Sequence, residues 1–309
     1  MYPISPQLAA FVAKTESFTS DDSSLAGLRQ NYDRMCQVFT PARPEGLLIE
    51  DCCLAGVNVR SYLPTTPTPP NGWPCLLYMH GGGWVVGGLD SHDFICFELA
   101  NTLQVLVIAI DYRLAPEHPF PAAYDDRRAV WQAIQAGQGP YAIDLQRLVV
   151  AGDSAGGNLA AALCLGLRDD GQALPLAQVL IYPGLGGPAD LPSRRDCRDA
   201  PLLSTADSDY YRALYLGDDA QLSPYGMPLL AKDFSGLPEA FIAVAQFDPL
   251  RDDGMLYAER LQAAGVTTLL YPGKGLVHGC LRARRQVPEV DRLYDYLLDY
   301  LRREGMTQV

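Results

Sequence analysis

Short apolar runs rich in β-branched residues alternate along the chain with longer stretches of helical character. This alternation predicts a mostly parallel sheet whose two faces are both covered by helices. Only Ala55 and Gly56 join the first two runs, so we expect a hairpin that enters the sheet antiparallel. The eight candidate strands are Leu47–Cys52, Val57–Leu63, Cys75–Met79, Val105–Ile110, Leu148–Ala151, Gln178–Tyr182, Ala240–Phe247 and Thr267–Tyr271.

The stretches between these runs predict the helices of an α/β fold. A chain of 309 residues, 48% of them apolar, can build one large buried core. We therefore expect a single domain over residues 1–309. The candidate helices are Asp93–Thr102, Ala122–Ala136, Ala155–Arg168, Gly254–Ala264 and Glu289–Arg303.

Two segments interrupt the alternation of strands and helices. Residues 1 to about 45 precede the first strand and have helical character over Pro6–Lys14 and Leu25–Phe39. Residues 184 to about 236 begin rich in glycine and proline and enter a helix near Ser204. We expect both segments to form a cap, while the remaining residues form the core. For the first segment the alternative is a helix that packs at the periphery.

The charge and the apolar pattern restrict the partners. A net charge of −12 disfavours binding to nucleic-acid phosphates or anionic membranes. No apolar run approaches the roughly 18 residues that span a bilayer, and the start of the chain lacks the pattern of a secretory leader. We therefore expect a cytoplasmic protein without stable membrane insertion, acting on a small molecule.

The eight cysteines and four histidines suggest no metal centre. A core of this size needs no disulfides, and Cys75, Cys96 and Cys164 lie inside apolar segments, so buried free thiols are favoured over disulfides. Cys52 and Cys53 are adjacent and have no CxxC partner, which supports neither a zinc site nor a redox motif. We predict no metal and no cofactor.

One pentapeptide has the pattern of a nucleophile elbow. Gly152-Asp153-Ser154-Ala155-Gly156 follows an apolar run and opens a helix of small residues. That strand–turn–helix context is what an elbow requires, because the serine is held at positive φ and only glycine-sized neighbours let the strand and the helix approach. Ser154 is the candidate nucleophile. The alternative is an ordinary glycine-rich turn.

A serine hydroxyl needs an adjacent base, which is normally a histidine. In the chain order that accompanies this elbow, the histidine follows both the serine and the acid. Of the four histidines, only His278 follows Ser154. It lies in a glycine-flanked loop between a predicted strand and the last helix, so it is the candidate base. The alternative is a histidine of the surface or the core.

The histidine in turn needs a carboxylate that fixes its tautomer. Asp248 directly follows an apolar run, which puts it at the carboxyl end of a strand, where ligands gather in open α/β sheets. Asp252 and Asp253 lie one turn further on and are expected to begin the next helix. They remain the alternatives to Asp248.

Acyl transfer also needs backbone donors for the oxyanion of the tetrahedral intermediate. His80-Gly81-Gly82-Gly83-Trp84 follows a predicted strand and supplies a loop whose amide groups can face a substrate. We expect Trp84, next to this loop, to form part of the substrate pocket.

At this point the sequence resembles the hormone-sensitive-lipase-like family of carboxylesterases. The resemblance covers about residues 45 to 300. It rests on HGGGW at 80–84, DYRLAPEHPFPAAYDD at 111–126, GDSAGGNLA at 152–160, YPG at 182–184, DPLRDDG at 248–254 and HGC at 278–280.

The resemblance implies a capped eight-stranded α/β-hydrolase fold and hydrolysis of short-chain acyl esters without a cofactor. It places the oxyanion donors on the amides of Gly82, Gly83 and Ala155, and the triad on the three candidates named above. His80 would then brace the glycine loop. The stretch 111–126, with His118, would be scaffold beside the site and carry no chemistry.

One departure from the family is Cys280, where an aromatic such as Phe is usual. The triad does not depend on this position, but local packing and substrate fit do. The segment 1–45 also matches the family weakly.

Two other functions remain open. An amidase or peptidase uses the same machinery, because acyl transfer to water passes through the same intermediate. Some relatives of the fold serve as small-molecule receptors, but these typically lack a triad member, and this chain retains all three.

Overall fold

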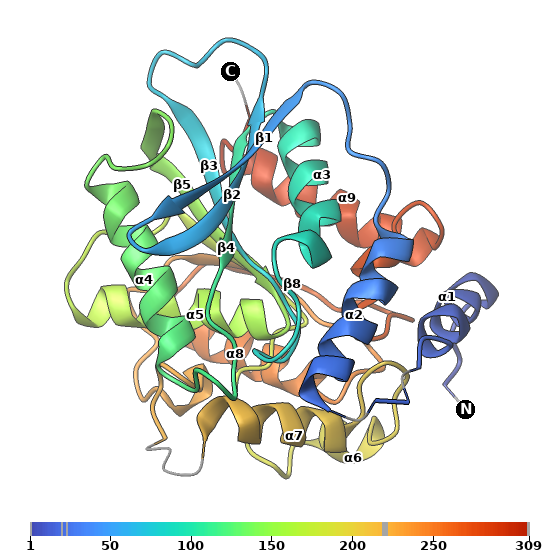
Figure 1. The fold of residues 1–309 in the computed structure, drawn as a ribbon. Coiled ribbons are helices and arrows are strands. Elements are labelled where there is room, and N and C mark those ends of the chain that lie inside the picture. Colours follow the sequence, from blue (N-terminus) through green and yellow to red (C-terminus); the bar gives the residue numbers. More distant parts are fainter. Residues whose placement is uncertain (1, 20, 23, 218–221, 308–309) are drawn as a thin grey trace.

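A computed structural model describes residues 2–19, 21–22, 24–217 and 222–307. The strands form one sheet in the order β1-β2-β4-β3-β5-β6-β7-β8 (Figure 1). This arrangement confirms the α/β fold with a mostly parallel sheet. The strands are β1 (Leu47–Leu54), β2 (Val57–Pro64), β3 (Trp73–Met79), β4 (Leu106–Asp111), β5 (Ile143–Asp153), β6 (Ala177–Ile181), β7 (Glu239–Ala243) and β8 (Thr268–Tyr271).

The first two strands form the antiparallel hairpin that the sequence predicts. Leu54 pairs with Val57 at its tip, where Ala55 and Gly56 both have positive φ. β2 is also antiparallel to β4, and every later pair of neighbouring strands is parallel. Parallel strands put their carboxyl ends at the same edge of the sheet, so the loops that follow β3, β5, β7 and β8 meet there.

Helices lie on both faces of the sheet and beyond one of its ends (Figure 1). They are α1 (Pro6–Glu16), α2 (Leu25–Phe39), α3 (Asp93–Leu103), α4 (Ala122–Gln135), α5 (Ala155–Asp169), α6 (Pro192–Asp196), α7 (Thr205–Leu216), α8 (Arg251–Ala263) and α9 (Pro288–Arg303). Short 3₁₀ helices are η1 (Asp90–His92), η2 (Pro228–Leu230) and η3 (Cys280–Ala283). No helix among the described residues is long and apolar enough to cross a membrane.

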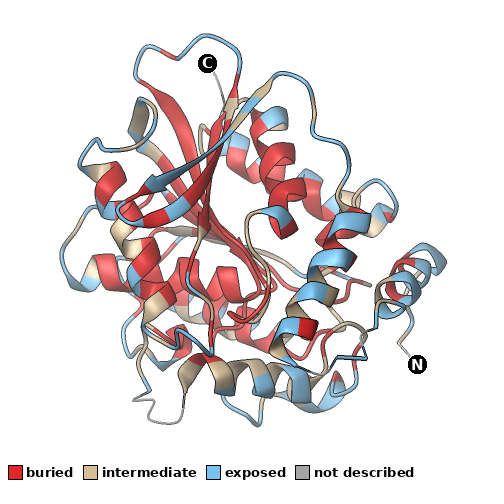
Figure 2. Ribbon diagram, in the orientation of Figure 1, coloured by how far each residue is buried: buried red, intermediate tan, exposed pale blue. Residues whose placement is uncertain are grey.

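The two faces of the sheet build two separate apolar cores. Along β3, Leu76 and Tyr78 join the core under α3 and α9, while Cys75, Leu77 and Met79 join the core under α4, α5 and α8. This alternation follows from the two-residue period of a strand. Both sets are buried because both faces are covered, and Figure 2 shows the central strands buried along their length.

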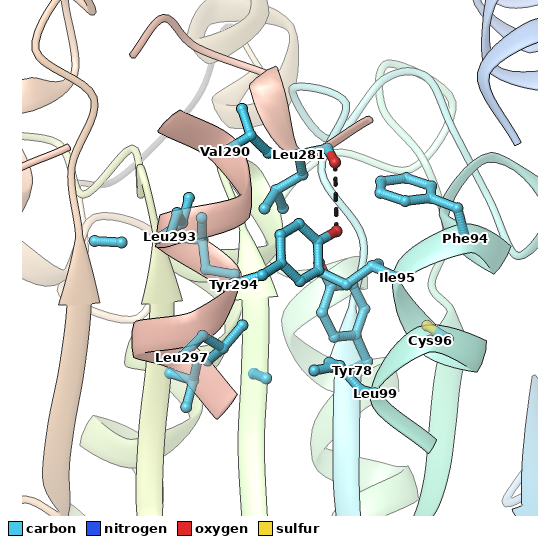
Figure 3. Close-up of a cluster of buried hydrophobic side chains, with 14 of the residues drawn as sticks. Tyr78, Phe94, Ile95, Cys96, Leu99, Leu281, Val290, Leu293, Tyr294 and Leu297 are labelled. Atoms are coloured by element: carbon cyan, nitrogen blue, oxygen red, sulfur yellow. Dashed lines mark hydrogen bonds between the residues drawn. The ribbon is translucent and has the colours of Figure 1, made fainter. Parts of the chain in front are cut away.

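The contact between α9 and α3 shows how helical spacing builds one of these cores. Val290, Leu293, Tyr294 and Leu297 recur every three or four residues on α9 and point toward the sheet and α3 (Figure 3). The Tyr294 hydroxyl donates to the Leu281 carbonyl oxygen at 3.4 Å. One face of α9 is therefore buried against the sheet and α3.

The segment around β7 differs from its prediction. The apolar run suggests a strand over Ala240–Phe247, but β7 ends at Ala243. Its partner β8 ends at Tyr271, and beyond these ends the two segments stay side by side through irregular hydrogen bonds, from the Val244 amide to the Tyr271 carbonyl oxygen and from the Gln246 amide to the Gly273 carbonyl oxygen. A parallel bridge between Phe247 and Val277 follows these hydrogen bonds.

The two interrupting segments contain helices close to those expected. α1 and α2 occupy the first, and α6 and α7 the second. α7 begins at a capping box, in which the Ser204 side chain accepts from the Asp207 amide and the Asp207 side chain accepts from the Ser204 amide. In Figure 1, α2 and α7 lie near the same end of the sheet.

We expect Leu297→Ala to lower the free energy of unfolding by about 2–5 kcal/mol, because it leaves a cavity in a close-packed core. Leu297 is fully buried, whereas Asp295 is exposed on the same helix. Asp295→Ala is therefore the control, with an expected change within about 0.5 kcal/mol. Urea unfolding followed by circular dichroism measures both, and equal losses would contradict the packing of α9.

Candidate active site

Ser154 lies in the turn between β5 and α5. Its φ of 54° is positive, which is rare for a residue with a side chain. The Ser154 amide donates to the Ile181 carbonyl oxygen at 2.8 Å and holds the turn against β6. A Cβ on Gly156 would collide with the Met79 carbonyl oxygen, so only glycine permits this approach of α5 to β3. The turn has the strained geometry of a nucleophile elbow.

His278 and Asp248 are brought together by the bridge between Phe247 and Val277, since each follows one bridged residue directly. The Phe247 amide donates to the Leu276 carbonyl oxygen at 2.9 Å, which fixes the two loops side by side. His278 Nδ1 then lies 2.7 Å from Asp248 Oδ2.

The three candidates form one hydrogen-bonded chain. His278 Nε2 lies 2.9 Å from Ser154 Oγ, so the imidazole joins the serine to the carboxylate. Asp248 is fully buried, and its second oxygen accepts from the Leu250 amide at 2.8 Å. A carboxylate held in this way can fix the orientation of the imidazole.

Asp252 and Asp253, the alternatives for the carboxylate, are occupied elsewhere in the first turn of α8. Asp252 accepts from the Ser193 amide at 2.8 Å. Asp253 accepts from the amides of Leu185 and Gly186 and pairs with an arginine of α6 at 2.8 Å. Both carboxylates therefore tie the segment after β6 to α8.

The glycine loop follows β3 and carries two amide groups, those of Gly82 and Gly83, that stay unpaired within the described residues. Gly82 and Gly83 have φ values of 124° and 59°. Across the described part of the chain, neither amide donates to a protein acceptor. Both residues line the same cavity as Ser154 and Ala155. The loop thus presents N–H groups beside the serine, as an oxyanion hole requires.

His80 lies buried at the base of this loop. Its Nδ1 is 2.7 Å from the Gly81 carbonyl oxygen, and its ring stacks on Tyr112 with centroids 4.2 Å apart. Burial lowers the pKa of His80 to about 3, and the neighbouring His92 acts in the same direction. The ring is therefore neutral and holds the loop. Tyr112 belongs to the stretch 111–126, which lies against the loop at this point.

Asp153, the residue before the serine, is a part of the site that the sequence reasoning missed. Its Oδ1 accepts from the Tyr78 hydroxyl at 2.7 Å and from the Gly81 amide at 3.1 Å. His92 Nε2 lies 3.3 Å from the other oxygen. Burial opposes ionisation, but His92 and Tyr78 outweigh it and lower the pKa of Asp153. The elbow motif accepts any residue at this position, so the sequence did not indicate a role for Asp153.

A cavity of about 220 Å³ lies above Ser154 and His278. Trp84 lines it and stacks on Tyr215 of α7, with centroids 4.3 Å apart and planes 8° from parallel. Sequence reasoning assigned no role to Tyr182, whose ring centroid lies 4.7 Å from that of His278. Other lining side chains come from both interrupting segments and include Phe11, Tyr32, Met35, Leu202, Leu203 and Tyr211.

Cys280, the departure from the family pattern, is fully buried in the core under α9. Burial raises the pKa of its thiol, which therefore stays protonated. All eight cysteines are free, and Cys52 and Cys53 are exposed on the edge strand β1. Within the described ranges, no three His, Cys, Asp or Glu side chains are grouped as a metal site would need.

We expect the protein to lose stability as the pH falls from about 6.5 toward 5. Burial lowers the pKa of both His80 and His92 in the folded protein. The unfolded chain binds protons at these residues below about pH 6.5, and the folded chain does not, so each proton taken up favours unfolding. Urea unfolding across this range measures the effect.

The control for this experiment is His118→Gln, which removes an exposed histidine. In this variant the free energy of unfolding should change with pH as it does in the parent. A free energy of unfolding that stays constant between about pH 7 and about pH 5 would contradict neutral, buried His80 and His92.

Comparison with known proteins places this site in a family. Residues 76–282 match the family described as alpha/beta hydrolase fold. The chain is 40% identical over 275 residues to Esterase LipI of Mycobacterium tuberculosis, covering 87% of this chain and 85% of that one. It is 34% identical over 302 residues to an ethyl acetate hydrolase of Pseudomonas putida, covering 93% and 95%.

A solved structure agrees with these matches. The crystal structure of an esterase from the bacterial hormone-sensitive lipase family superposes with a TM-score of 0.86 and 27% identity, covering 97% of this chain and 98% of that one. The family match over residues 76–282 includes the loops that carry Ser154, Asp248 and His278. The chain belongs to the hormone-sensitive-lipase-like carboxylesterases, which are serine hydrolases with the α/β-hydrolase fold.

Proposed function

We propose that the protein hydrolyses short-chain acyl esters, with Ser154 as nucleophile, His278 as general base and Asp248 as the carboxylate that orients the imidazole. The observation that carries this proposal is the continuous chain from Ser154 Oγ through His278 to Asp248, with contacts of 2.9 and 2.7 Å. Ser154 and His278 also line a cavity that is large enough for a small ester.

In the acylation half of the reaction, Ser154 Oγ attacks the ester carbonyl carbon while His278 Nε2 takes the hydroxyl proton. The carbonyl π bond opens and its oxygen becomes an oxyanion. When the tetrahedral intermediate collapses, the bond to the alcohol oxygen breaks. His278 returns its proton to the departing alcohol, and the acyl group remains on Ser154.

Deacylation repeats these steps with water. His278 takes a proton from the water, whose oxygen attacks the acyl carbon of the acyl-serine. Collapse breaks the bond to Ser154 Oγ, which recovers its proton from His278. The carboxylic acid leaves, and the enzyme is regenerated. No cofactor takes part in either half of the reaction.

The oxyanion of both intermediates is stabilised by the amides of Gly82, Gly83 and Ala155. Donors held in place before the reaction need no reorganisation when charge develops, and loss of one costs roughly 3 kcal/mol of transition-state stabilisation. His80 keeps the loop in position through its Gly81 contact and its stacking on Tyr112.

The chain is organised as one α/β-hydrolase domain over residues 1–309, with a cap from about 1–45 and 184–236. Side chains of both segments line the cavity above Ser154, among them Phe11 and Met35 from the first and Tyr211 from the second. Such walls exclude water and limit the length of the acyl group. The relative named for ethyl acetate hydrolysis agrees with a small acyl group.

Ser154→Ala should lower kcat for p-nitrophenyl butyrate by roughly 10⁴ or more, because it removes the nucleophile. A phosphonylating reagent should label Ser154 alone, as read by peptide mass spectrometry. The control is Ser235→Ala, an exposed serine far from the cavity, which should keep the parent's rate. A Ser154→Ala enzyme with near-native turnover would rule out this mechanism.

The cap predicts a maximum of activity at short acyl chains, about two to eight carbons, and a steep fall for long-chain triglycerides. Deleting residues 1–40 should lower the rate or shift this profile, since it opens one wall of the cavity. Phe11→Ala tests the same wall with less risk to folding and should move the maximum to longer chains. A series of p-nitrophenyl esters measures both.

A matched control for this series is Val38→Ala, because Val38 is exposed on α2 and does not line this cavity. Its chain-length profile should equal the parent's. If Phe11→Ala and a folded deletion variant both keep the parent's rate and profile, the N-terminal segment is not part of the cap.

A further inference from the structure

A basic stretch directly after His278 has no role in the proposed mechanism. Arg282, Arg284 and Arg285 stand together in a chain whose net charge is −12. All three line a second cavity, of about 270 Å³, between η3, α3 and the end of α2. We call it the arginine cavity. Its other lining residues are Val38, Phe39, Thr40, Pro41, Phe94, Glu98 and Gln286.

The charges around the arginine cavity do not balance. Glu98 is the one carboxylate among its described lining residues, and its two oxygens accept from Arg284 and Arg285 at 2.8 Å each. Arg282 forms no ion pair with a carboxylate in the described part of the chain, and its Nη2 donates to the Tyr32 hydroxyl at 2.8 Å. The buried Asp153 carboxylate interacts with Arg282 through space, so three guanidinium groups stand against two carboxylates and one positive charge is in excess.

Several N–H groups around this cavity also lack a partner. Among the described residues, Arg282 Nε and both Nε and Nη1 of Arg284 are buried without a hydrogen bond. Arg282 is only 7% exposed. Buried donors of this kind are rarely left unpaired in native proteins.

Aromatic rings cover the faces of these two guanidinium groups. Arg284 Cζ lies 4.0 Å from the centroid of Tyr294, and Arg282 Cζ lies 5.4 Å from that of Phe94. Figure 3 shows both rings beside the core under α9. With the planar faces covered, the N–H groups remain at the edges, in the geometry that binds a carboxylate in two places.

Much of the remaining lining is apolar and includes Val38, Phe39, Pro41 and Phe94. A bare inorganic anion would leave this wall without a contact. We propose that the arginine cavity binds a carboxylate that carries a short aliphatic chain. Its head lies on Arg284 and Arg285, and its chain lies against the apolar wall. This ligand belongs to the class of acid that ester hydrolysis releases.

The test uses enzyme whose Ser154 carries a hexylphosphonate, so that the active site is already filled. Isothermal titration then compares hexanoate with hexanol, which has the chain alone, and with inorganic phosphate, which has an anionic head alone. Hexanoate should bind at one site per chain, and the two partial probes at least about tenfold more weakly.

Arg285→Gln should weaken hexanoate binding about tenfold or more, and its exposed side chain makes misfolding a small risk. Arg292→Gln, at an exposed arginine of α9 outside the cavity, should leave binding unchanged. The proposal is overturned if hexanoate does not bind to the blocked enzyme, or if hexanol or phosphate binds as tightly as hexanoate. It is also overturned if Arg285→Gln binds hexanoate as tightly as the parent and Arg292→Gln do.

Discussion

The relative position of Ser154 and the glycine loop depends on the buried carboxylate of Asp153. It stands at the end of β5 and accepts from Tyr78 of β3 and from the Gly81 amide. The two strands are neighbours in the sheet, but their ladder ends where Met79 pairs with Gly152. Beyond that point, Asp153 continues the connection with charge-assisted hydrogen bonds in a site shielded from water.

A second connection beyond the strand ends positions the other half of the site. The single bridge between Phe247 and Val277 restores pairing after β7 and β8 have ended. It sets His278 beside Asp248 without relying on either side chain. In both places the regular strand pairing ends before the site residues. A local contact, at Asp153 in the first and at Phe247 in the second, holds the following loops side by side. In this arrangement both contacts of His278, to Asp248 and to Ser154, are shorter than 3 Å.

Local patterns predicted the elements whose partners are close in sequence or common to the fold. The helix Leu25–Phe39 was expected with its observed bounds. Ser154 was identified as a candidate from its motif, Asp248 from its place after an apolar run and His278 from chain order. The contacts of Asp153 and Arg282 could not be expected in this way. Each depends on segments far apart in the chain, and a lone Asp or Arg has no pattern that distinguishes it. The early end of β7 was missed because apolar content does not report where a partner strand ends.

The stack of Trp84 on Tyr215 has a consequence for how this enzyme can evolve. It joins the residue after the glycine loop to α7, and a Cβ on Gly83 would also collide with the ring of Tyr211. In the proposed mechanism, α7 is therefore in direct contact with the loop that carries the oxyanion donors. Substitutions on this side of α7 cannot tune selectivity alone. Adaptation to a new ester must proceed through changes that preserve this aromatic contact or replace both of its sides together.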